Sequence, residues 1–180
     1  MSKPSLQDLD WSRAFAKQAL SDLQIRDQIV EREKSHPGSV PRCHELHYLQ
    51  MAAEKVCKAH LIANAGQASV RNTHRVVVTQ LPTIYREFAA PLEDRNKRAA
   101  AKAKSRAVRR LAEEIEALAP AVKRGGGKPQ NAEYPWSGPQ QQVVIPCEYD
   151  FPELPIQDIT LTPVIKVLRA AAYKYANDVL

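Results

Sequence analysis

The chain has 180 residues, of which 44% are hydrophobic and 26% charged, a balance typical of a globular protein with one core. We therefore expect a single domain over residues 1–180, and the net charge of +6 favours an anionic partner such as nucleic acid, a nucleotide or an acidic protein. No run of about 18 apolar residues would span a bilayer and the first residues lack the apolar part of a secretory signal, so a cytoplasmic protein without a membrane segment is predicted.

The first predicted helix begins at Asp8 or Asp10 and ends at Lys34, where the sequence HPGSVP at 36–41 interrupts it. Its remaining surface is charged, and we expect that surface to face water. An imperfect apolar stripe contains Trp11, Phe15, Ala19, Leu20, Leu23 and Val30.

The second predicted helix, over 43–65, has the most regular pattern and ends at Gly66. Glu54 and Lys58 lie four residues apart on its other side, which predicts a solvated surface pair. His60 is expected to be a hydrogen-bonded core residue. The apolar face consists of Leu46, Leu49, Ala53, Val56, His60 and Ala63.

A third helix is predicted over Thr73–Ala90, with Asn72 or Thr73 as its N-cap and a kink at Pro82. The apolar spacing, extended backwards, directs His74 toward the bundle. The polar residues at this point therefore have two interpretations: they cap a helix, or they form a site. The apolar positions are Val77, Leu81, Ile84 and Phe88.

A fourth helix is predicted over Glu93–Val122, and its first half is strongly basic. Cations at a helix N-terminus oppose the helix dipole. Two explanations stay open: a solvated face, or a surface that binds an anion. The candidate nucleic-acid-binding residues are Arg98, Lys102, Arg106, Arg109 and Arg110.

Residues from about 123 to 160 are rich in Gly, Pro and Gln and predict a long loop, with a few extended residues at VVIP. The rings of Tyr134 and Trp136 indicate that part of this loop packs on the bundle. The last helix begins at Thr162, with Pro163 in its first turn.

The fold class predicted from these elements is all-α: an antiparallel bundle of four to five helices with one long loop before the last. The predicted core includes Leu49, Ala53, Val56, Leu81, Ile84, Leu111, Ile115 and Leu168.

The stretch LQMAAEKVCKAHLIA in the second helix resembles the HEPN superfamily of helical bundles, the higher eukaryotes and prokaryotes nucleotide-binding domains. The preceding AKQALSDLQ, the start of the third helix at His74, the NAEYPW loop and a closing helix of small and aromatic residues are also similar. The resemblance covers roughly residues 10–90 and 131–176. The basic fourth helix has no counterpart in it.

This resemblance implies a bundle that forms a homodimer or a complex with a second protein, such as a minimal nucleotidyltransferase, in a toxin-antitoxin or defence-type system. The surplus of apolar residues also favours association. Two functions are implied: a module that binds RNA, a nucleotide or a partner protein, and a metal-independent endoribonuclease.

The ribonuclease branch of that superfamily has an Arg followed after four to six residues by a His. Arg71, Asn72 and His74 supply these residue types with only two residues between Arg and His, whereas Arg42 and His47 have four between them but lie at the start of the second helix. In such a site His would transfer the proton of the ribose 2′-hydroxyl and Arg would stabilise the phosphorane, without a metal. The spacing at Arg71 departs from the nuclease pattern, and we therefore favour the binding module.

Other chemistries lack their motifs. No phosphate-binding Gly loop, GxSxG or HExxH is present, and the three cysteines have no CxxC spacing, which indicates reduced thiols. His44 and His47 share a helix face, but no third ligand joins them at a diagnostic spacing. No metal and no cofactor is predicted.

Overall fold

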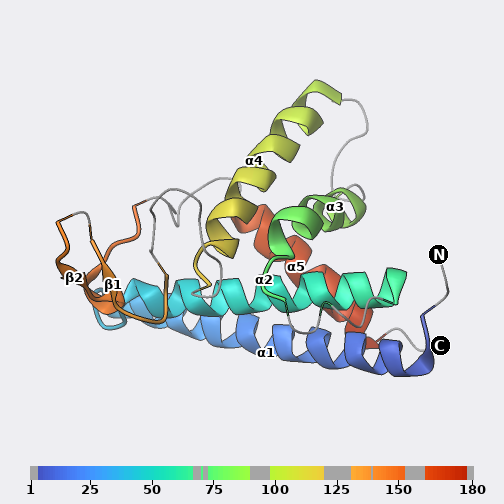
Figure 1. Ribbon diagram of the computed structural model, residues 1–180, viewed down its shortest axis with the longest axis horizontal. Helices are drawn as coiled ribbons and strands as arrows, with labels where there is room; N and C mark the ends of the chain where they lie inside the picture. The colour runs from blue at the N-terminus through green and yellow to red at the C-terminus, as the bar shows by residue number, and fades with distance from the viewer. Residues whose placement is uncertain are drawn as a thin grey trace.

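The computed structural model describes residues 4–66, 70, 73–89, 98–119, 131–138, 140–152 and 161–177, with side chains from residue 104 onward in the fourth of these stretches. A short antiparallel hairpin, β1 (Trp136–Ser137) with β2 (Val143–Val144), and a 3₁₀ turn, η3 (Pro146–Glu148), precede the last helix. The predicted all-α bundle is confirmed (Figure 1). Its helices are α1 (Leu6–Ser35), α2 (Arg42–Ala65), α3 (Val77–Ala89), α4 (Arg98–Glu116) and α5 (Leu161–Asn177).

The two longest helices, α1 and α2, run antiparallel along the molecule (Figure 1). α1 starts at Leu6 because the Ser5 hydroxyl accepts a hydrogen bond from the Asp8 amide at 3.2 Å, while the Asp8 carboxylate accepts one from the Ser5 amide at 3.0 Å. The helix therefore begins slightly before the predicted Asp8. α2 ends as predicted at Gly66, whose φ of +59° suits a residue without a Cβ.

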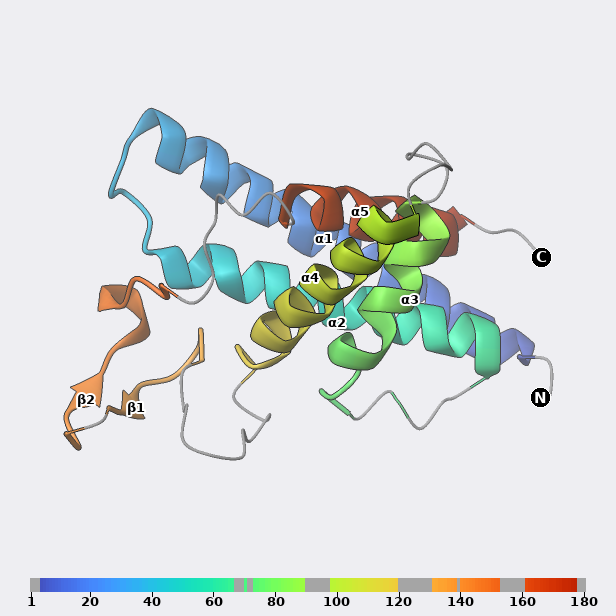
Figure 2. The same ribbon diagram turned by 90° about the horizontal axis from the view of Figure 1, so that it is seen from above.

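α2 occupies the middle of the bundle. It contacts α1, α3, α4 and α5. Figure 2 shows α5 crossing the α1–α2 pair, with α3 and α4 also lying over α2. α4 projects from this body, with its N-terminal end farthest out and its C-terminal end against the bundle (Figure 1).

The predicted core is confirmed. All eight of its residues are buried, with exposed fractions between 0% and 6%. They come from α2, α3, α4 and α5 and join one continuous apolar cluster. Among the described residues, no helix is long and apolar enough to cross a membrane.

The predicted face of α1 is partly wrong. Trp11 is 40% exposed, although it was placed in the apolar stripe, whereas Asp22 and Arg26 are buried, although a wet charged surface was expected. Asp22 and Arg26 are buried because they pair with Lys55 and Glu45 of α2, which packs along α1.

α3 begins at Val77, later than the predicted Thr73. Thr73 does not cap the helix, because its hydroxyl accepts a hydrogen bond from the Arg75 amide at 3.2 Å. The first turn of α3 is capped by a residue from α4 instead: the Glu116 carboxylate accepts from the Val78 amide at 3.0 Å. Local sequence patterns could not predict this cap, because Glu116 lies in another helix, far along the chain from Val78.

The C-terminal end of α4 differs from the prediction, whereas the predicted start at Glu93 lies outside the described residues. The described part begins at Arg98, and residues 90–97 lie outside the described ranges. The helix ends at Glu116, before the predicted Val122, because the amides of Leu118 and Ala119 bond to carbonyls three residues back.

The predicted loop of 123–160 is described in part, over residues 131–138 and 140–152. The extended residues expected at VVIP are confirmed as β2. Trp136 joins the apolar cluster of the bundle as expected, and its ring centroid lies 5.3 and 6.0 Å from those of Tyr149 and Phe151. Tyr134, expected to pack as well, is 61% exposed. This aromatic cluster fixes the segment against the start of α2, which η3 contacts.

Leu49→Asp is expected to destabilise the protein by at least ~3 kcal/mol, because it places an unpaired carboxylate among fully buried side chains. The free energy of unfolding in a denaturant titration measures this loss. Leu6→Asp is the matched control, since Leu6 is 71% exposed and an acid suits the first turn of a helix. Equal stability of the two variants would show that the buried face of α2 is misassigned.

Candidate functional site

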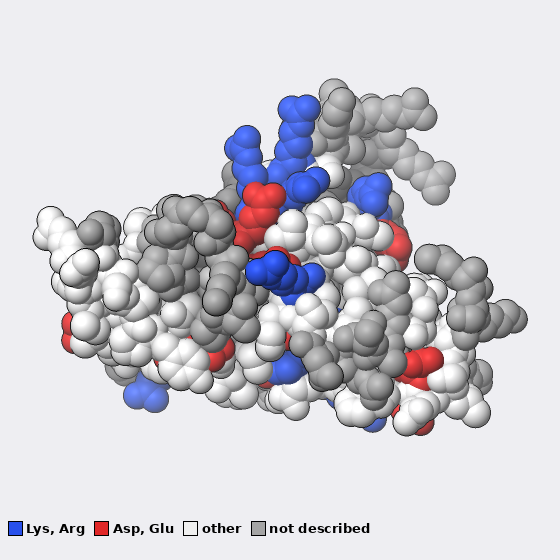
Figure 3. All heavy atoms as spheres, in the orientation of Figure 1, with Lys and Arg blue, Asp and Glu red and all other residues white. Residues whose placement is uncertain are grey.

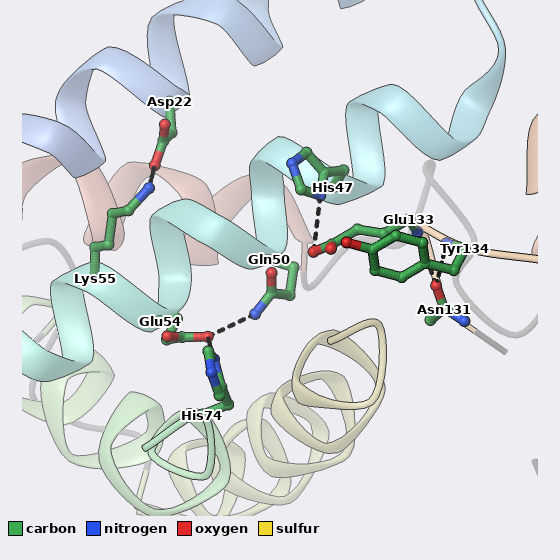
Figure 4. A network of polar contacts seen from close by, with 9 residues as sticks. All are labelled: Asp22, His47, Gln50, Glu54, Lys55, His74, Asn131, Glu133 and Tyr134. Carbon is green, nitrogen blue, oxygen red and sulfur yellow. Dashed lines mark hydrogen bonds and ion pairs between the residues drawn. The ribbon is translucent and has the colours of Figure 1, made fainter. Parts of the chain in front are cut away.

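Glu54, near the middle of α2, is the centre of a buried polar cluster (Figure 4). Its Oε1 lies 2.8 Å from the Lys58 ammonium, and its Oε2 accepts a hydrogen bond from the Gln50 amide at 2.9 Å. The same Oε2 lies 3.1 Å from Nδ1 of His74. We call Gln50, Glu54, Lys58 and His74 the Glu54 cluster.

The prediction that Glu54 and Lys58 form a solvated surface pair is therefore wrong, because both residues are buried. Only 6% of Glu54 and 4% of Lys58 is exposed. Both residues lie on the side of α2 opposite its regular apolar face. The sequence did not predict that other helices would cover this polar side. The Lys58 ammonium also lies over the Phe15 ring, 5.5 Å from its centroid.

Two opposing effects act on the pKa of Glu54. Burial alone would raise it, because water no longer solvates the carboxylate, but the hydrogen bond and charge of Lys58, joined by those of His74, outweigh burial. The net result is a pKa below the ordinary value. Glu54 is therefore a carboxylate at neutral pH.

His74 is the one member of the predicted catalytic trio that the structure describes, since Arg71 and Asn72 lie outside the described residues. It precedes α3, and its side chain is 49% exposed. Glu54 contacts the imidazole through Nδ1, and no contact of Nε2 with another described residue is found. A buried carboxylate that orients a half-exposed histidine is an arrangement suited to proton transfer.

The alternative pair, Arg42 and His47, is not brought together on one surface. The Arg42 guanidinium donates to the carbonyl oxygen of Asp150 at 2.5 Å and lines a cavity that His47 does not line. Nδ1 of His47 lies 3.3 Å from the Glu133 carboxylate (Figure 4). The two side chains thus contact different parts of the 131–152 segment.

Two further buried ion pairs tie α1 to α2. Lys55 reaches Asp22 at 2.5 Å, and Arg26 pairs with Glu45. These contacts explain why charged residues of α1 are buried. In both pairs a charge of α1 is compensated by an opposite charge of α2.

The predicted nucleic-acid-binding residues lie on α4, and the structure describes the side chains of Arg106, Arg109 and Arg110 among them. All three are exposed. Arg109 lies 3.5 Å from Glu113 in a solvent-exposed pair. Figure 3 shows Lys and Arg side chains projecting over the α4 region. The side chains of Arg98 and Lys102 lie outside the described set.

His60 is a core residue, as predicted. It is 5% exposed, and its Nδ1 lies 2.7 Å from the Tyr175 hydroxyl. Burial lowers the pKa of His60, so the ring is neutral at physiological pH. Among the described residues, no group of three His, Cys, Asp or Glu is arranged to hold a metal ion.

Sequence patterns missed the role of Glu54, Gln50 and Lys58. One available signal was their spacing: Gln50, Glu54 and Lys58 follow one another at intervals of four, so they form a continuous polar line along α2. A second was the small residues between them, which permit other helices to approach. Comparison of the chain with family models, with curated proteins and with solved structures gave no match.

Lys58→Met is expected to destabilise the protein by about 3–5 kcal/mol at pH 7, because it leaves Glu54 buried without its ammonium partner. The loss should shrink as the pH falls toward ~4.3, because the unpaired buried carboxyl of the variant takes up its proton above that pH. It should shrink further below ~4.3, where the unmodified protein loses the stability that its paired carboxylate contributes. Denaturant titrations at several pH values measure both effects.

The double variant Glu54→Gln/Lys58→Met is the control for this prediction. It removes both charges at nearly constant volume and should recover much of the lost stability. A loss that is independent of pH, or a double variant no more stable than Lys58→Met, would contradict the assigned ionic pair.

Proposed function

We propose that this chain is a helical-bundle module that binds single-stranded nucleic acid, RNA foremost, through the exposed arginines of α4. The observation that carries the proposal is the exposure of Arg106, Arg109 and Arg110 on a helix that projects from the body. Phosphates are the groups that arginines recognise best, and a charged surface without interleaved aromatics gives weak binding that does not depend on sequence.

The resemblance to HEPN bundles supports the same class of function, since those domains bind nucleotides, RNA or partner proteins. It further implies assembly with a second copy or another protein, and large apolar side chains are exposed at Leu6, Trp11 and Tyr173.

Sedimentation at micromolar concentration should show a species larger than one chain, alone or with a protein encoded beside it. A monomer under both conditions would contradict the assembly.

Reversal of Arg106, Arg109 and Arg110 to Glu is expected to abolish binding to a single-stranded oligonucleotide. If about four cations of the helix contact phosphates, the slope of log affinity against log salt for the unmodified protein should be near −3. Fluorescence anisotropy in a salt series measures both. Helix content and melting temperature should hardly change, because these side chains are exposed.

The matched control is reversal of Lys17, Arg32 and Lys34, three exposed cations of α1 that give the same change in net charge. Binding should survive this change apart from a small long-range effect. If both triple variants lose binding equally, net charge and not the α4 surface is responsible.

A second function, metal-independent endoribonuclease, is favoured by one observation: the buried Glu54 carboxylate orients the half-exposed His74. In this reaction His74 takes the proton of a ribose 2′-hydroxyl, and the leaving oxygen departs as a 2′,3′-cyclic phosphate forms. The nuclease spacing is absent at Arg71, so the binding module without chemistry remains our first choice.

Mixed RNA incubated with the purified protein in EDTA distinguishes the two functions. For the binding module we expect no fragments ending in 2′,3′-cyclic phosphate. Fragments that disappear with His74→Ala but persist with His44→Ala, an exposed histidine of α2, would replace the binding module by the nuclease. The double variant Glu54→Gln/Lys58→Met removes the carboxylate that holds His74 without leaving Lys58 buried and unpaired, and it should then lower the rate.

A further inference from the structure

The first turn of α2 and the η3 turn lie against each other, far apart in the chain but adjacent in the fold. A cavity of about 420 Å³ opens between them and the end of α1. Arg42, at the start of α2, and Cys147, Tyr149 and Asp150, in and after η3, line it. The cavity gives small molecules access to this junction.

Two thiols lie at the junction. Cys43, in the first turn of α2, is 3% exposed, whereas Cys147 in η3 is exposed and lines the cavity. The hydrogen bond from Arg42 to the Asp150 carbonyl ties the two segments together next to the cysteines. The aromatic contact between Tyr149 and Phe151, with centroids 4.9 Å apart, anchors the same segment.

The thiols also interact electrostatically. Burial raises the pKa of Cys43, and the charge of Cys147 raises it further, while the first-turn amides of Cys43 and His44 lower it. η3, which carries Cys147, contacts α2, and Arg42, the neighbour of Cys43, is bonded to Asp150, so the two cysteines lie in adjoining turns.

We propose that Cys147 and Cys43 form a reversible redox site for hydroperoxides, in which the exposed thiol reacts and the buried one resolves. The Cys147 thiolate attacks the peroxide, the O–O bond breaks, and a sulfenic acid forms as water or an alcohol leaves. Cys43 then attacks the Cys147 sulfur, an S–S bond forms and water leaves. The peroxide gains two electrons and the dithiol loses two; a low-molecular-weight thiol restores the reduced pair by exchange.

The third cysteine supplies an internal control. Cys57 has no exposed surface, and burial, together with the charges of Glu116 and Glu54, raises its pKa well above the ordinary value. It should be inert toward peroxide in the folded protein.

The test uses the full chain treated with hydrogen peroxide, then denatured and alkylated, with intact mass and peptide mapping. We expect a loss of two hydrogens, a cross-linked peptide that contains Cys43 and Cys147, and Cys57 alone alkylated. Glutathione should reverse the change. Cys57→Ala should form the same disulfide.

Two single variants separate the roles. Cys43→Ser should leave a Cys147 sulfenic acid that dimedone traps, whereas Cys147→Ser should leave Cys43 alkylatable after peroxide. The proposal is overturned if both cysteines of the unmodified protein remain alkylatable, if the disulfide contains Cys57, or if Cys43→Ser yields no trapped sulfenic acid. Peptide mapping of the unmodified protein decides the first two outcomes even where a variant fails to fold.

Discussion

Glu54 lies inside a bundle where four helices surround the one that carries it, and a carboxylate in that position is tolerated only with its partners in place. Lys58 supplies the opposite charge, and Gln50 and His74 supply hydrogen-bond partners for the remaining oxygen. The arrangement of α2 among the other helices therefore depends on this compensation. The pairs Asp22–Lys55 and Arg26–Glu45 apply the same constraint between α1 and α2.

The same constraint positions the start of α3. His74 is held by Glu54 on one side, and Glu116 caps the first turn of α3 on the other. A segment without helical structure is thus fixed at both ends by carboxylates from α2 and α4. This is how a half-exposed imidazole acquires a defined orientation, which any proton-transfer role would require.

Charge is divided between the interior and the surface in a way that suits the proposed function. Near the centre, charges of both signs neutralise one another, whereas the described arginines of α4 are exposed on a projecting helix. The helix dipole acts mainly within the first and last turns of a helix, and Arg106, Arg109 and Arg110 lie in neither turn of α4, so the dipole does not explain their presence. The redox junction lies at a different place, between α2 and η3.

Periodicity predicted the helices well, because each apolar stripe repeats at the helical spacing: the eight predicted core residues are buried, and Gly66 ends α2. The bounds of α3 were less predictable, because Glu116 caps it from another helix. The placement of His60 in the core followed from its position on the apolar face of α2. The candidate site was predicted only in part: the sequence indicated His74 but placed Glu54 and Lys58 at the surface.

The sequence by itself determined the helical class, the main apolar faces and the basic character of α4, since these are local properties of residue type and spacing. Only the tertiary structure decided that the polar line of α2 is buried, that Glu54 holds His74, and that η3, with Cys147, lies against α2, whose first turn carries Cys43. The physical reason is that a helix with polar residues on one side has the same local pattern whether water or another helix covers that side. In this protein α3 and α4 pack on α2, and the buried charges are tolerated because they are paired.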